Sequence, residues 1–469
     1  AGDLLDAVFK VLHRIEGAYA LGIVCADEPD RLVAVRKDSP LILGYGANFH
    51  MLASDVTAVI QHTREVCYLE DGEIAVLTRD GIRVFNHPYL QPVEKEKYHV
   101  DWEVSAAEKG GYEHFMAKEI MEQPKAFRDT VFPRIQDGRV VLDDLNLDGD
   151  YLRETDKIYI IACGSSYHVG MVAKYILEKL LRKPVEVSLA SEFRYCDPLV
   201  TEKTLCIVIS QSGETIDTLA ALREAKRLGA RILSIVNVVG SSIARESDDV
   251  LYTWAGPEIA VATTKAYSTQ LAVIYLIALR FAELLGTISG EIYDHIVSEL
   301  LTIPTKMEHI LENREAIQYY ASIYFNHESI FFIGRNIDYA IGLEGSLKLK
   351  EISYIHSEAY AAGELKHGTI SLIEQGTLVV ALASCTQLFD KLMSNVVEVK
   401  SRGADVLGLT VESRAEAMKK TVDHAILVPD THPMLLPSLD VLPMQLFAYY
   451  VALMRGCDID KPRNLAKSA

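Results

Sequence analysis

The amino-acid sequence predicts an α/β protein with two tandem parallel-sheet modules, preceded by a smaller part rich in antiparallel strands. Unbroken apolar runs alternate with helix-like patterns from about residue 157 onward, which is typical of buried parallel strands separated by helices. This order of patterns repeats in the second half of the chain. The first hundred residues instead have short strands punctuated by Asp-Gly and Gly-Xaa-Gly turns, which favours antiparallel β structure.

The N-terminal part is expected to span residues 1–92. Its GYGANF stretch resembles half of a dinucleotide-binding fingerprint, but the third glycine is not in place, so we interpret it as a turn. Two charged stretches follow, Glu94–Lys97 and Asp101–Lys109, and they have the composition of a linker. Residues 93–140 are therefore assigned to a linker and a helix.

The first parallel-sheet module is expected over residues 141–300. Its strands are predicted from continuous apolar runs at Ile158–Ala162, Leu205–Ile209, Ile232–Val236 and Val250–Trp254. Helical patterns connect these runs at Tyr167–Leu180, Thr215–Leu228 and about Lys265–Leu285.

The second module is expected over residues 301–460, because the stretch from Thr377 repeats the order of the stretch from Thr204. Both have a strand, a hydroxyl-bearing turn, a helix, a Gly-Ala pair and another strand, and IIACGSS has a counterpart in FFIGRN. Coincidence between generic α/β units is the alternative, but spacing and glycine placement both favour duplication, with a boundary near 302–326. A short tail, residues 461–469, completes the chain.

The bulk composition excludes several classes of function. The net charge of −18 argues against a general nucleic-acid binder, so an anionic ligand needs local donors to hold it. The 7 cysteines are an odd number without paired spacing, which favours reduced thiols and a cytoplasmic location. No membrane partner is expected, because the apolar stretch around 271–279 is interrupted by Arg280 and Glu283 before the roughly 20 residues of a span.

Two turns rich in hydroxyl groups predict a phosphate site. Ser210-Gln211-Ser212-Gly213-Glu214-Thr215 and Cys163-Gly164-Ser165-Ser166 each follow a predicted strand and precede a predicted helix. In parallel sheets such turns present free N–H groups to an anion. The alternative is that each serine only caps its helix. Capping explains one turn well, but two such turns with glycines that permit close backbone approach favour a phosphate.

Acid/base chemistry is predicted for the segment from Leu343 to Leu372. Glu344, Lys348 and Glu351 share one face of a predicted helix, either as a solvated ion-pair ladder or as part of a cleft. The following Ser353–Gly368, dense in Tyr, His and Glu, is interpreted as a loop that lines this cleft, so a carboxylate and His367 could transfer protons. No spacing matches a zinc motif, and no metal is expected.

The tail residue Lys467 is a candidate for bonding to a carbonyl substrate. A basic terminal stretch is usually frayed. Pro462-Arg463-Asn464 is nevertheless stiff, so Lys467 could close over an anionic ligand, and a lysine beside a carbonyl can form a Schiff base.

Five motifs, taken together, resemble the glutamine–fructose-6-phosphate aminotransferase (glucosamine-6-phosphate synthase) family along the whole chain: ACGSSYH, SQSGET, EIAVATTKAYSTQ, KLKEISYIHSEAYAAGELKHG and PRNLAKS. The resemblance implies the second half of an N-terminal-nucleophile glutaminase domain (α+β), followed by two SIS-type sugar-phosphate modules. It further implies a homodimer that converts fructose 6-phosphate and glutamine into glucosamine 6-phosphate and glutamate without an organic cofactor. That reaction opens the hexosamine route to UDP-N-acetylglucosamine.

The resemblance also implies roles for individual residues. Glu351 would move a proton between C1 and C2, His367 would assist ring opening from the neighbouring subunit, and Lys467 would form an imine with the open-chain ketose. Lys348 and Glu344 would support them. Substrate binding would fall to the phosphate-binding residues Ser165, Ser166, Ser210, Gln211, Ser212 and Thr215 and to the pocket residues Val261, Thr263 and Ala466.

The sequence departs from the family pattern in three places. KHGTI replaces the usual KHGPL, and the C-terminus is two or three residues short. Residue 1 is Ala1, where the family has its catalytic cysteine. The chain is therefore expected to be a fragment or a sequence that starts late, and a polypeptide starting at Ala1 is not expected to release ammonia from glutamine.

A function from another class stands beside the enzyme: a non-catalytic SIS-type sugar-phosphate sensor, which binds without turnover. Such a sensor needs the phosphate turns but not Glu351, His367 and Lys467 together. Regulators of this kind often carry a DNA-binding helix-turn-helix, and the sequence has neither that motif nor the basic charge it needs. The residues therefore favour the enzyme.

Overall fold

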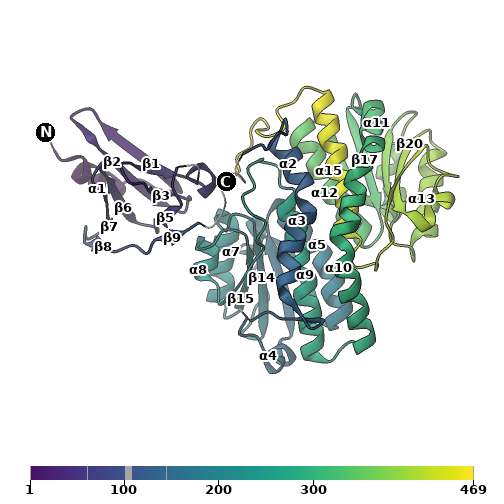
Figure 1. Cartoon of the computed structure of the whole chain (residues 1–469), viewed down its shortest axis with the longest axis horizontal. Helices are drawn as coiled ribbons and strands as arrows, with labels where there is room; N and C mark the ends of the chain where they lie inside the picture. The colour runs from purple at the N-terminus through teal and green to yellow at the C-terminus, as the bar shows by residue number, and fades with distance from the viewer. Residues whose placement is uncertain (1, 61, 101–107, 144, 468–469) are drawn as a thin grey trace.

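The N-terminal part contains the helix α1 (Leu4–Leu12), a short 3-10 helix (Val56–Ala58) and two antiparallel sheets, drawn in purple in Figure 1. The computed structural model describes residues 2–60, 62–100, 108–143 and 145–467. Asp3 caps α1. One sheet has the order β1-β2-β6-β7-β8 and the other β4-β3-β5-β9. The strands are β1 (Tyr19–Cys25), β2 (Glu28–Lys37), β3 (Ile42–Tyr45), β4 (His50–Ala53), β5 (Glu65–Tyr68), β6 (Glu73–Leu77), β7 (Ile82–Asn86), β8 (Pro92–Val93) and β9 (Tyr98–His99).

The antiparallel part extends beyond residue 92 into the range expected as linker. β9 pairs with β5, with Val66 opposite Tyr98. The Tyr98 ring also packs on the first parallel-sheet module, where a Cβ on Gly240 would lie 3.0 Å from a ring carbon. This packing accompanies a short strand between the two charged stretches, which their linker-like composition did not indicate. Most of the second charged stretch, residues 101–107, lies outside the described residues.

The first parallel-sheet module has a five-stranded sheet of order β13-β12-β14-β15-β16. Each neighbouring pair is parallel; for example, Ile158 lies opposite Leu205. The strands are β12 (Lys157–Ala162), β13 (Val185–Leu189), β14 (Thr204–Ser210), β15 (Arg231–Val236) and β16 (Asp249–Tyr252). The helices are α2 (Phe115–Met121), α3 (Gln123–Val131), α4 (Gly149–Glu154), α5 (Gly164–Leu181), α6 (Ala190–Phe193), α7 (Ile216–Arg227), α8 (Ser242–Glu246) and α9 (Lys265–Leu285).

The second module repeats this topology, with the sheet order β18-β17-β19-β20-β21. The two parallel modules predicted from the repeated pattern are thus confirmed. The strands are β17 (Ser329–Gly334), β18 (His356–Ala361), β19 (Leu378–Leu382), β20 (Asp405–Val411) and β21 (His424–Val428). The helices are α10 (Gly290–Glu312), α11 (Glu315–Tyr324), α12 (Ile337–Ser353), α13 (Phe389–Lys400), α14 (Ala415–Met418) and α15 (Pro437–Met454).

Two expectations about the second module differ from the structure. The expected cut between residues 300 and 301 falls inside the continuous helix α10. The segment 353–368, interpreted as a loop, contains the edge strand β18, which pairs in parallel with β17. Its charged and aromatic residues fit a strand because one face of an edge strand remains accessible to solvent. A 3-10 helix, Ala362–His367, follows it.

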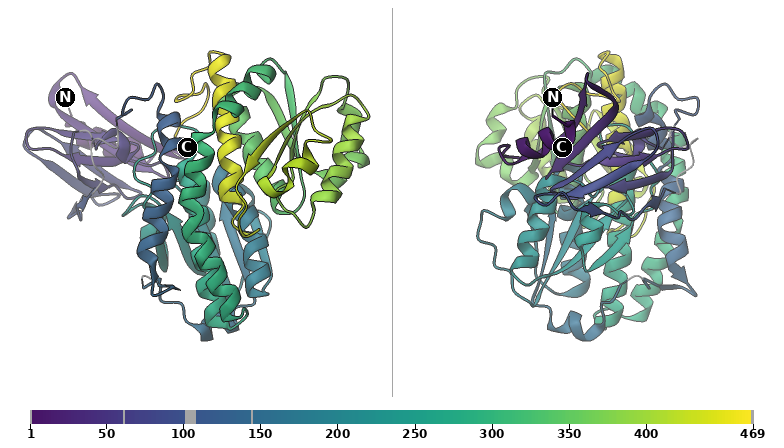
Figure 2. Two further views of the ribbon diagram at one scale, coloured as in Figure 1. Left: turned by 45° about the vertical axis from the view of Figure 1, so that its right-hand side comes forward. Right: turned by 90° about the vertical axis from the view of Figure 1, so that its left-hand side faces the viewer.

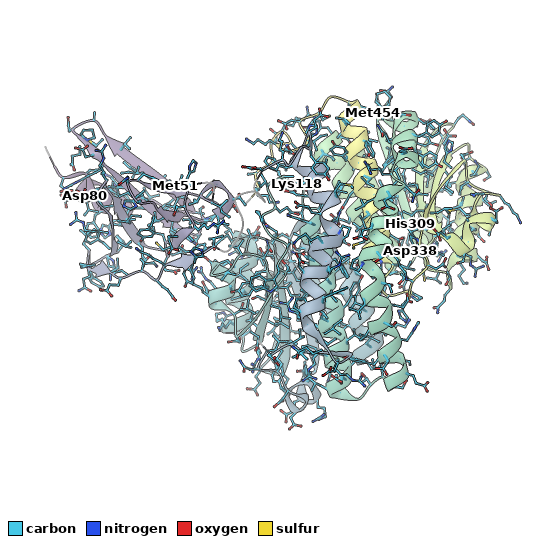
Figure 3. The ribbon with its side chains drawn as sticks, in the orientation of Figure 1. Met51, Asp80, Lys118, His309, Asp338 and Met454 are labelled. Carbon is cyan, nitrogen blue, oxygen red and sulfur yellow. The ribbon has the colours of Figure 1, made fainter. Side chains whose placement is uncertain are left out.

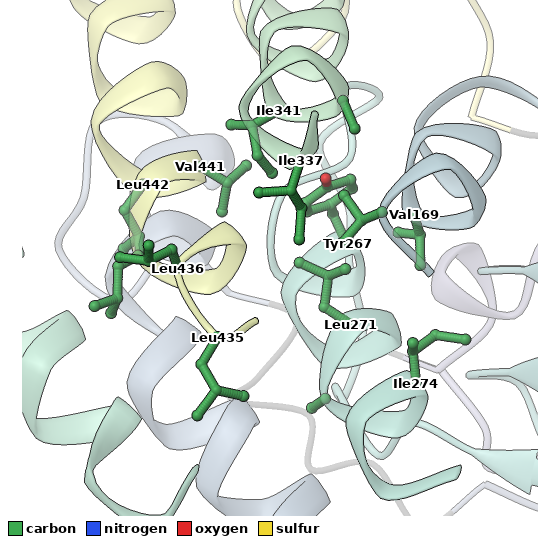
Figure 4. Close-up of a cluster of buried hydrophobic side chains, with 14 of the residues drawn as sticks. Val169, Tyr267, Leu271, Ile274, Ile337, Ile341, Leu435, Leu436, Val441 and Leu442 are labelled. Atoms are coloured by element: carbon green, nitrogen blue, oxygen red, sulfur yellow. The ribbon is translucent and has the colours of Figure 1, made fainter. Parts of the chain in front are cut away.

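A layer of long helices lies between the two parallel sheets (Figure 2). Figure 4 shows buried side chains from α5, α9, α12 and α15 that point toward one another, among them Val169, Leu271, Ile341 and Val441. This cluster is continuous across both modules, so they share one core. α9 has the length and hydropathy of a membrane span, but 78% of its most apolar window is buried inside the fold.

Candidate active site

A pocket of about 300 Å³ opens at the carboxyl ends of β12 and β14. These strands lie side by side in the sheet, and the chain order reverses between them because β13 returns to the outer side of β12. Ligands of open α/β sheets bind at such reversal points. The pocket is lined by Cys163, Gly164, Ser165, Ser166, Ile209, Ser210, Gln211, Ser212, Thr215, Thr218, Val261, Thr263, Glu351, Leu465, Ala466 and Lys467.

The pocket brings together all nine predicted substrate-binding residues, along with Glu351 and Lys467. Helices α5 and α7 begin at the two hydroxyl-rich turns, so their N-terminal N–H groups point toward the space between them. Of the described residues that line the pocket, only Lys467 is a cation. The donors around the two turns are therefore hydroxyl and N–H groups without net charge.

The hydroxyl groups of the two turns do not cap their helices. Thr215 and Cys163 occupy the N-cap positions of α7 and α5, and neither makes a side-chain capping bond. Ser210 Oγ accepts a bond from the Gly213 N–H at 3.0 Å and lies 3.1 Å from Thr215 Oγ1. Ser165 Oγ instead donates to Glu344 Oε1 at 2.9 Å. The simple capping alternative is thus excluded at these positions.

Glu214 connects the turn after β14 to helix α8. The Glu214 carboxylate accepts bonds from the Ser242 N–H at 2.7 Å and the Ser242 hydroxyl at 2.8 Å. Gly213 has a φ of +68°, and an added Cβ would lie 2.0 Å from Ser241 Oγ. Glycine is therefore required here both for the left-handed backbone and for the close approach of α8.

Helix α12 of the second module supplies a buried charge network to the pocket. Lys348 Nζ lies 2.5 Å from Glu351 Oε2 and 3.5 Å from Glu344 Oε1, and the Lys348 and Glu344 side chains are fully buried. Glu344 also accepts a bond at 2.8 Å from His168 on α5. The solvated-ladder alternative is therefore wrong for this helix face, which connects the second module to α5 of the first module through Glu344 and His168.

The charges of this network stabilise one another. Burial alone would lower the pKa of Lys348, but the carboxylates of Glu351 and Glu344 raise it above its usual value. Burial would likewise raise the pKa of Glu344, which the Lys348 ammonium and His168 hold below its usual value. The Lys348 ammonium and the Glu344 carboxylate thus stabilise each other's charged forms, and Lys348 lies in direct contact with Glu351 at the pocket.

The tail residue Lys467 is held in the pocket instead of being frayed. Its Nζ donates to Glu258 Oε2 at 2.8 Å and to the Ala260 carbonyl at 2.7 Å. Upstream, the Val261 N–H donates to the Asp460 carbonyl at 3.0 Å, which ties the tail to the same segment. The Lys467 side chain is 14% exposed and lines the pocket, so a molecule bound in the pocket can reach its amine.

The structure of one chain does not bring His367 into the pocket. His367 is the last residue of the 3-10 helix Ala362–His367 and is exposed. Among the described residues, no group of three or more His, Cys, Asp or Glu side chains is arranged to hold a metal ion.

Sequence reasoning missed the residues behind the pocket. Glu258 lies in the quoted motif EIAVATTK but received no role, although it is fully buried beside Lys467. Gln270 on α9 accepts a bond from Ser166 Oγ at 3.1 Å. Glu119 on α2 is buried against the segment that carries Glu258. Glu119 had no signal, because α2 lies in the range assigned to a linker and a helix.

Comparisons with known proteins agree with this geometry. The model of the SIS domain matches residues 151–280 and 323–455, which together make up more than half of the chain. The glutamine–fructose-6-phosphate aminotransferases of Clostridium acetobutylicum and Methanosarcina acetivorans are 56% and 46% identical to it over 468 residues. These alignments cover 100% and 99% of this chain and 77% and 75% of the relatives.

This chain belongs to the glutamine–fructose-6-phosphate aminotransferase (isomerizing) family. The family assignment confirms the resemblance drawn from the five motifs. A solved C-terminal domain of the aminotransferase from Francisella tularensis superposes with a TM-score of 0.73 at 38% identity, covering 76% of this chain and all of that domain. A glucosamine-6-phosphate deaminase from Thermotoga maritima superposes with a TM-score of 0.59 at 25% identity, covering 76% of this chain and 99% of the deaminase.

Proposed function

We propose that this chain carries the isomerase half of an aminotransferase that makes glucosamine 6-phosphate from fructose 6-phosphate and glutamine-derived ammonia. The observation that carries the proposal is that two phosphate-type turns, a carboxylate and a lysine line one pocket. A sensor needs only the turns. Glu351 and Lys467 are the additional groups that turnover requires, and the relatives named above are aminotransferases.

In this proposal the phosphate binds to the N–H and hydroxyl groups of the turns around Ser165 and Ser210. The amine of Lys467 forms an imine with C2 of the open-chain sugar. Glu351 then moves a proton between C1 and C2, and its contact with the Lys348 ammonium holds the carboxylate in place. Ser212, Thr215, Val261, Thr263 and Ala466 surround the sugar.

Several assignments complete the proposal. Residues 2–99 form the part of a glutaminase domain that adjoins the first module, which their two antiparallel sheets support. The working unit is a homodimer in a cytoplasmic location. The exposed position of His367 supports a role in the neighbouring subunit, where its imidazole would assist opening of the sugar ring.

The test is interconversion of fructose 6-phosphate and glucose 6-phosphate, followed by nuclear magnetic resonance. Glu351→Gln should keep sugar-phosphate affinity and lower the rate by about 10²–10⁴, the usual contribution of a general base. The control is Glu328→Gln, which changes an exposed carboxylate at the amino end of β17 that does not line the pocket and should leave the rate unchanged. An unchanged rate in Glu351→Gln would exclude the proposed catalytic role.

A further inference from the structure

Two buried carboxylates lie beside Lys467, and the proposed function does not yet use them. Glu258 is fully buried and Glu119 is 2% exposed. The two carboxylate oxygens of Glu258 have different partners. Oε1 accepts hydrogen bonds from the N–H groups of Thr264 and Ala266 at 2.9 and 3.1 Å, and Oε2 accepts one from Lys467 Nζ at 2.8 Å. One oxygen thus caps α9, and the other contacts the amine.

Glu119 holds the same segment from the opposite side. Its Oε1 accepts the N–H groups of Ile259 and Ala260 at 2.5 and 3.3 Å. Its Oε2 is buried and has no hydrogen-bond partner among the residues that the structure describes. The Ala260 carbonyl meanwhile accepts Lys467 Nζ at 2.7 Å, so α2, this segment and the tail fix the position of the amine together.

The cluster carries one negative charge near neutral pH. Burial, and then the neighbouring Glu258 carboxylate, raise the pKa of Glu119 to about 8, so Glu119 is protonated. Burial alone would also raise the pKa of Glu258, but the Lys467 ammonium and the N–H groups of Ala266 and Thr264 hold it below its usual value. One carboxylate therefore faces one ammonium in a site with little access to water.

We propose that Glu258 is the proton carrier of Lys467: it accepts a proton from the ammonium before imine formation and returns it to the departing hydroxyl. The proposal rests on the proposed function of Lys467 as the imine-forming residue. Three observations support it. Glu258 Oε2 contacts the reacting nitrogen directly, and both side chains have little contact with solvent. Among the described residues, Lys467 is the only charged group that pairs with Oε2.

The step balances without another reactant. Glu258 takes one proton from the Lys467 ammonium, which leaves a neutral amine. The nitrogen lone pair forms the N–C2 bond while the C2 carbonyl electrons move to oxygen, and a proton passes from nitrogen to that oxygen. The protonated Glu258 then donates its proton to the C2 hydroxyl, which leaves as water as the nitrogen lone pair forms the C=N bond. A carboxylate–iminium pair replaces the carboxylate–ammonium pair.

A purely structural role is the competing explanation, because Glu258 also caps α9 and anchors the tail. Glu258→Gln separates the two roles, since its amide oxygen can still accept the N–H groups of Thr264 and Ala266 but the side chain no longer accepts a proton. The matched control is Asp338→Asn. Asp338, labelled in the second module in Figure 3, is another buried carboxylate that accepts a backbone N–H, here from Cys385 at 3.1 Å.

The experiment measures how fast fructose 6-phosphate becomes trapped on the protein under borohydride, with the modified peptide identified by mass spectrometry. The parent and Asp338→Asn should be trapped on Lys467 at the same rate. Glu258→Gln should be slower by about 10²–10⁴. Raising the acetate concentration at constant pH and ionic strength should accelerate the variant but not the parent, because acetate replaces the missing proton carrier.

Other results of the trapping experiment would contradict the role of Glu258, the role of Lys467 or both. Two results would overturn the role of Glu258 and leave the role of Lys467 untouched. One is trapping of Glu258→Gln at the parent rate. The other is slow trapping that acetate does not accelerate although the variant keeps its affinity for the sugar phosphate. Equal trapping in Lys467→Ala overturns the assignment of Lys467 as the imine-forming residue, and the role of Glu258 with it.

If Glu258→Gln does not fold, Glu258→Asp keeps the charge and withdraws the carboxylate by one methylene. That variant should also become slow and dependent on acetate, and its indifference to acetate would overturn the proposal.

Discussion

The buried charge of Lys348 should contribute to the stability of the protein. Lys348 is fully buried between Glu344 and Glu351, so removing its ammonium would leave a buried carboxylate without its counter-charge. Breaking a buried ion pair from one side costs about 3–5 kcal/mol. Lys348→Met should therefore lower the free energy of unfolding by about that amount in urea titrations. Lys350→Met, at an exposed position on the same helix, should change it little, and equal losses in both variants would contradict the account.

Glu119 should make the stability of the protein depend on pH. Its pKa rises from 4.5 to about 8 on folding, so between these values the folded protein binds more protons than the unfolded chain. The contribution of Glu119 to the free energy of unfolding must then fall as the pH rises through this interval. Glu119→Gln, which resembles the protonated form, should gain stability relative to the parent over the same interval.

The measurement for Glu119 is the difference in urea midpoint between parent and variant at several pH values. Glu328→Gln provides the control, because its carboxylate is exposed before β17 and its difference from the parent should be small throughout. A Glu119→Gln difference that does not change with pH would mean that Glu119 does not hold a proton in the folded protein.

At the scale of elements, the turn between β14 and α7 should discriminate phosphorylated from plain sugars. Each hydrogen bond to a charged group is worth roughly 1.5–3 kcal/mol. The double variant Ser210→Ala with Thr215→Ala should therefore weaken fructose 6-phosphate binding by several kcal/mol, measured by calorimetry, and leave binding of fructose unchanged. Thr386→Ala, at the corresponding turn of the second module, is the control. Equal losses for both sugars would exclude a phosphate at this turn.

Buried central elements of both sheets could be predicted from the sequence, and peripheral ones could not. β12 and β14 contain continuous apolar runs and β15 an apolar run with one serine, and the structure places all three within one residue of the expected bounds. The edge strand β13 has an alternating, half-buried pattern and was not recognised. β18 was interpreted as a loop for the same reason, because an edge strand exposes polar residues that resemble loop composition.

Some residues of the candidate site could be predicted from the sequence, and others required the structure. Residues within contiguous motifs, such as Ser210 and Ser165, could be found because strand, turn and helix follow one another along the chain. The partnership of Lys467 with Glu258 joins positions far apart in sequence, and only the folded chain shows that both belong to one cluster. Burial of Glu344 and Lys348 also required the structure, since their spacing suits a solvated ladder equally well.

At the scale of the whole molecule, the N-terminal part contacts the turn between β14 and α7 through Arg36. This buried arginine on β2 donates to the Leu69 carbonyl at 3.0 Å and lies 3.9 Å from Glu214 in the turn. Arg245 on α8 pairs with Glu70 at 2.9 Å across the same junction. The position of the turn is therefore coupled to the packing of the N-terminal part.

Removing this connection should affect binding at a distance. Arg36→Met leaves the buried Glu214 carboxylate with less positive charge nearby, and an unsatisfied buried polar group costs about 1–3 kcal/mol. Fructose 6-phosphate affinity, measured by calorimetry, should fall by up to that amount. The control is Arg83→Met, an exposed arginine on β7 of the same part. Unchanged affinity in Arg36→Met would show that the turn is independent of the N-terminal part.

The two hydroxyl-rich turns offer uncharged donors to the pocket, and this determines how binding should respond to salt. A site built from arginines and lysines loses affinity as salt screens its attraction for the substrate. Here the donors that the turns offer are uncharged hydroxyl and N–H groups and the whole chain has a net charge of −18, so the mean field of the chain repels a sugar phosphate. Added potassium chloride screens that repulsion and leaves the short hydrogen bonds nearly intact. The association rate of fructose 6-phosphate should accordingly rise with ionic strength in stopped-flow measurements, the reverse of the trend for a cationic site.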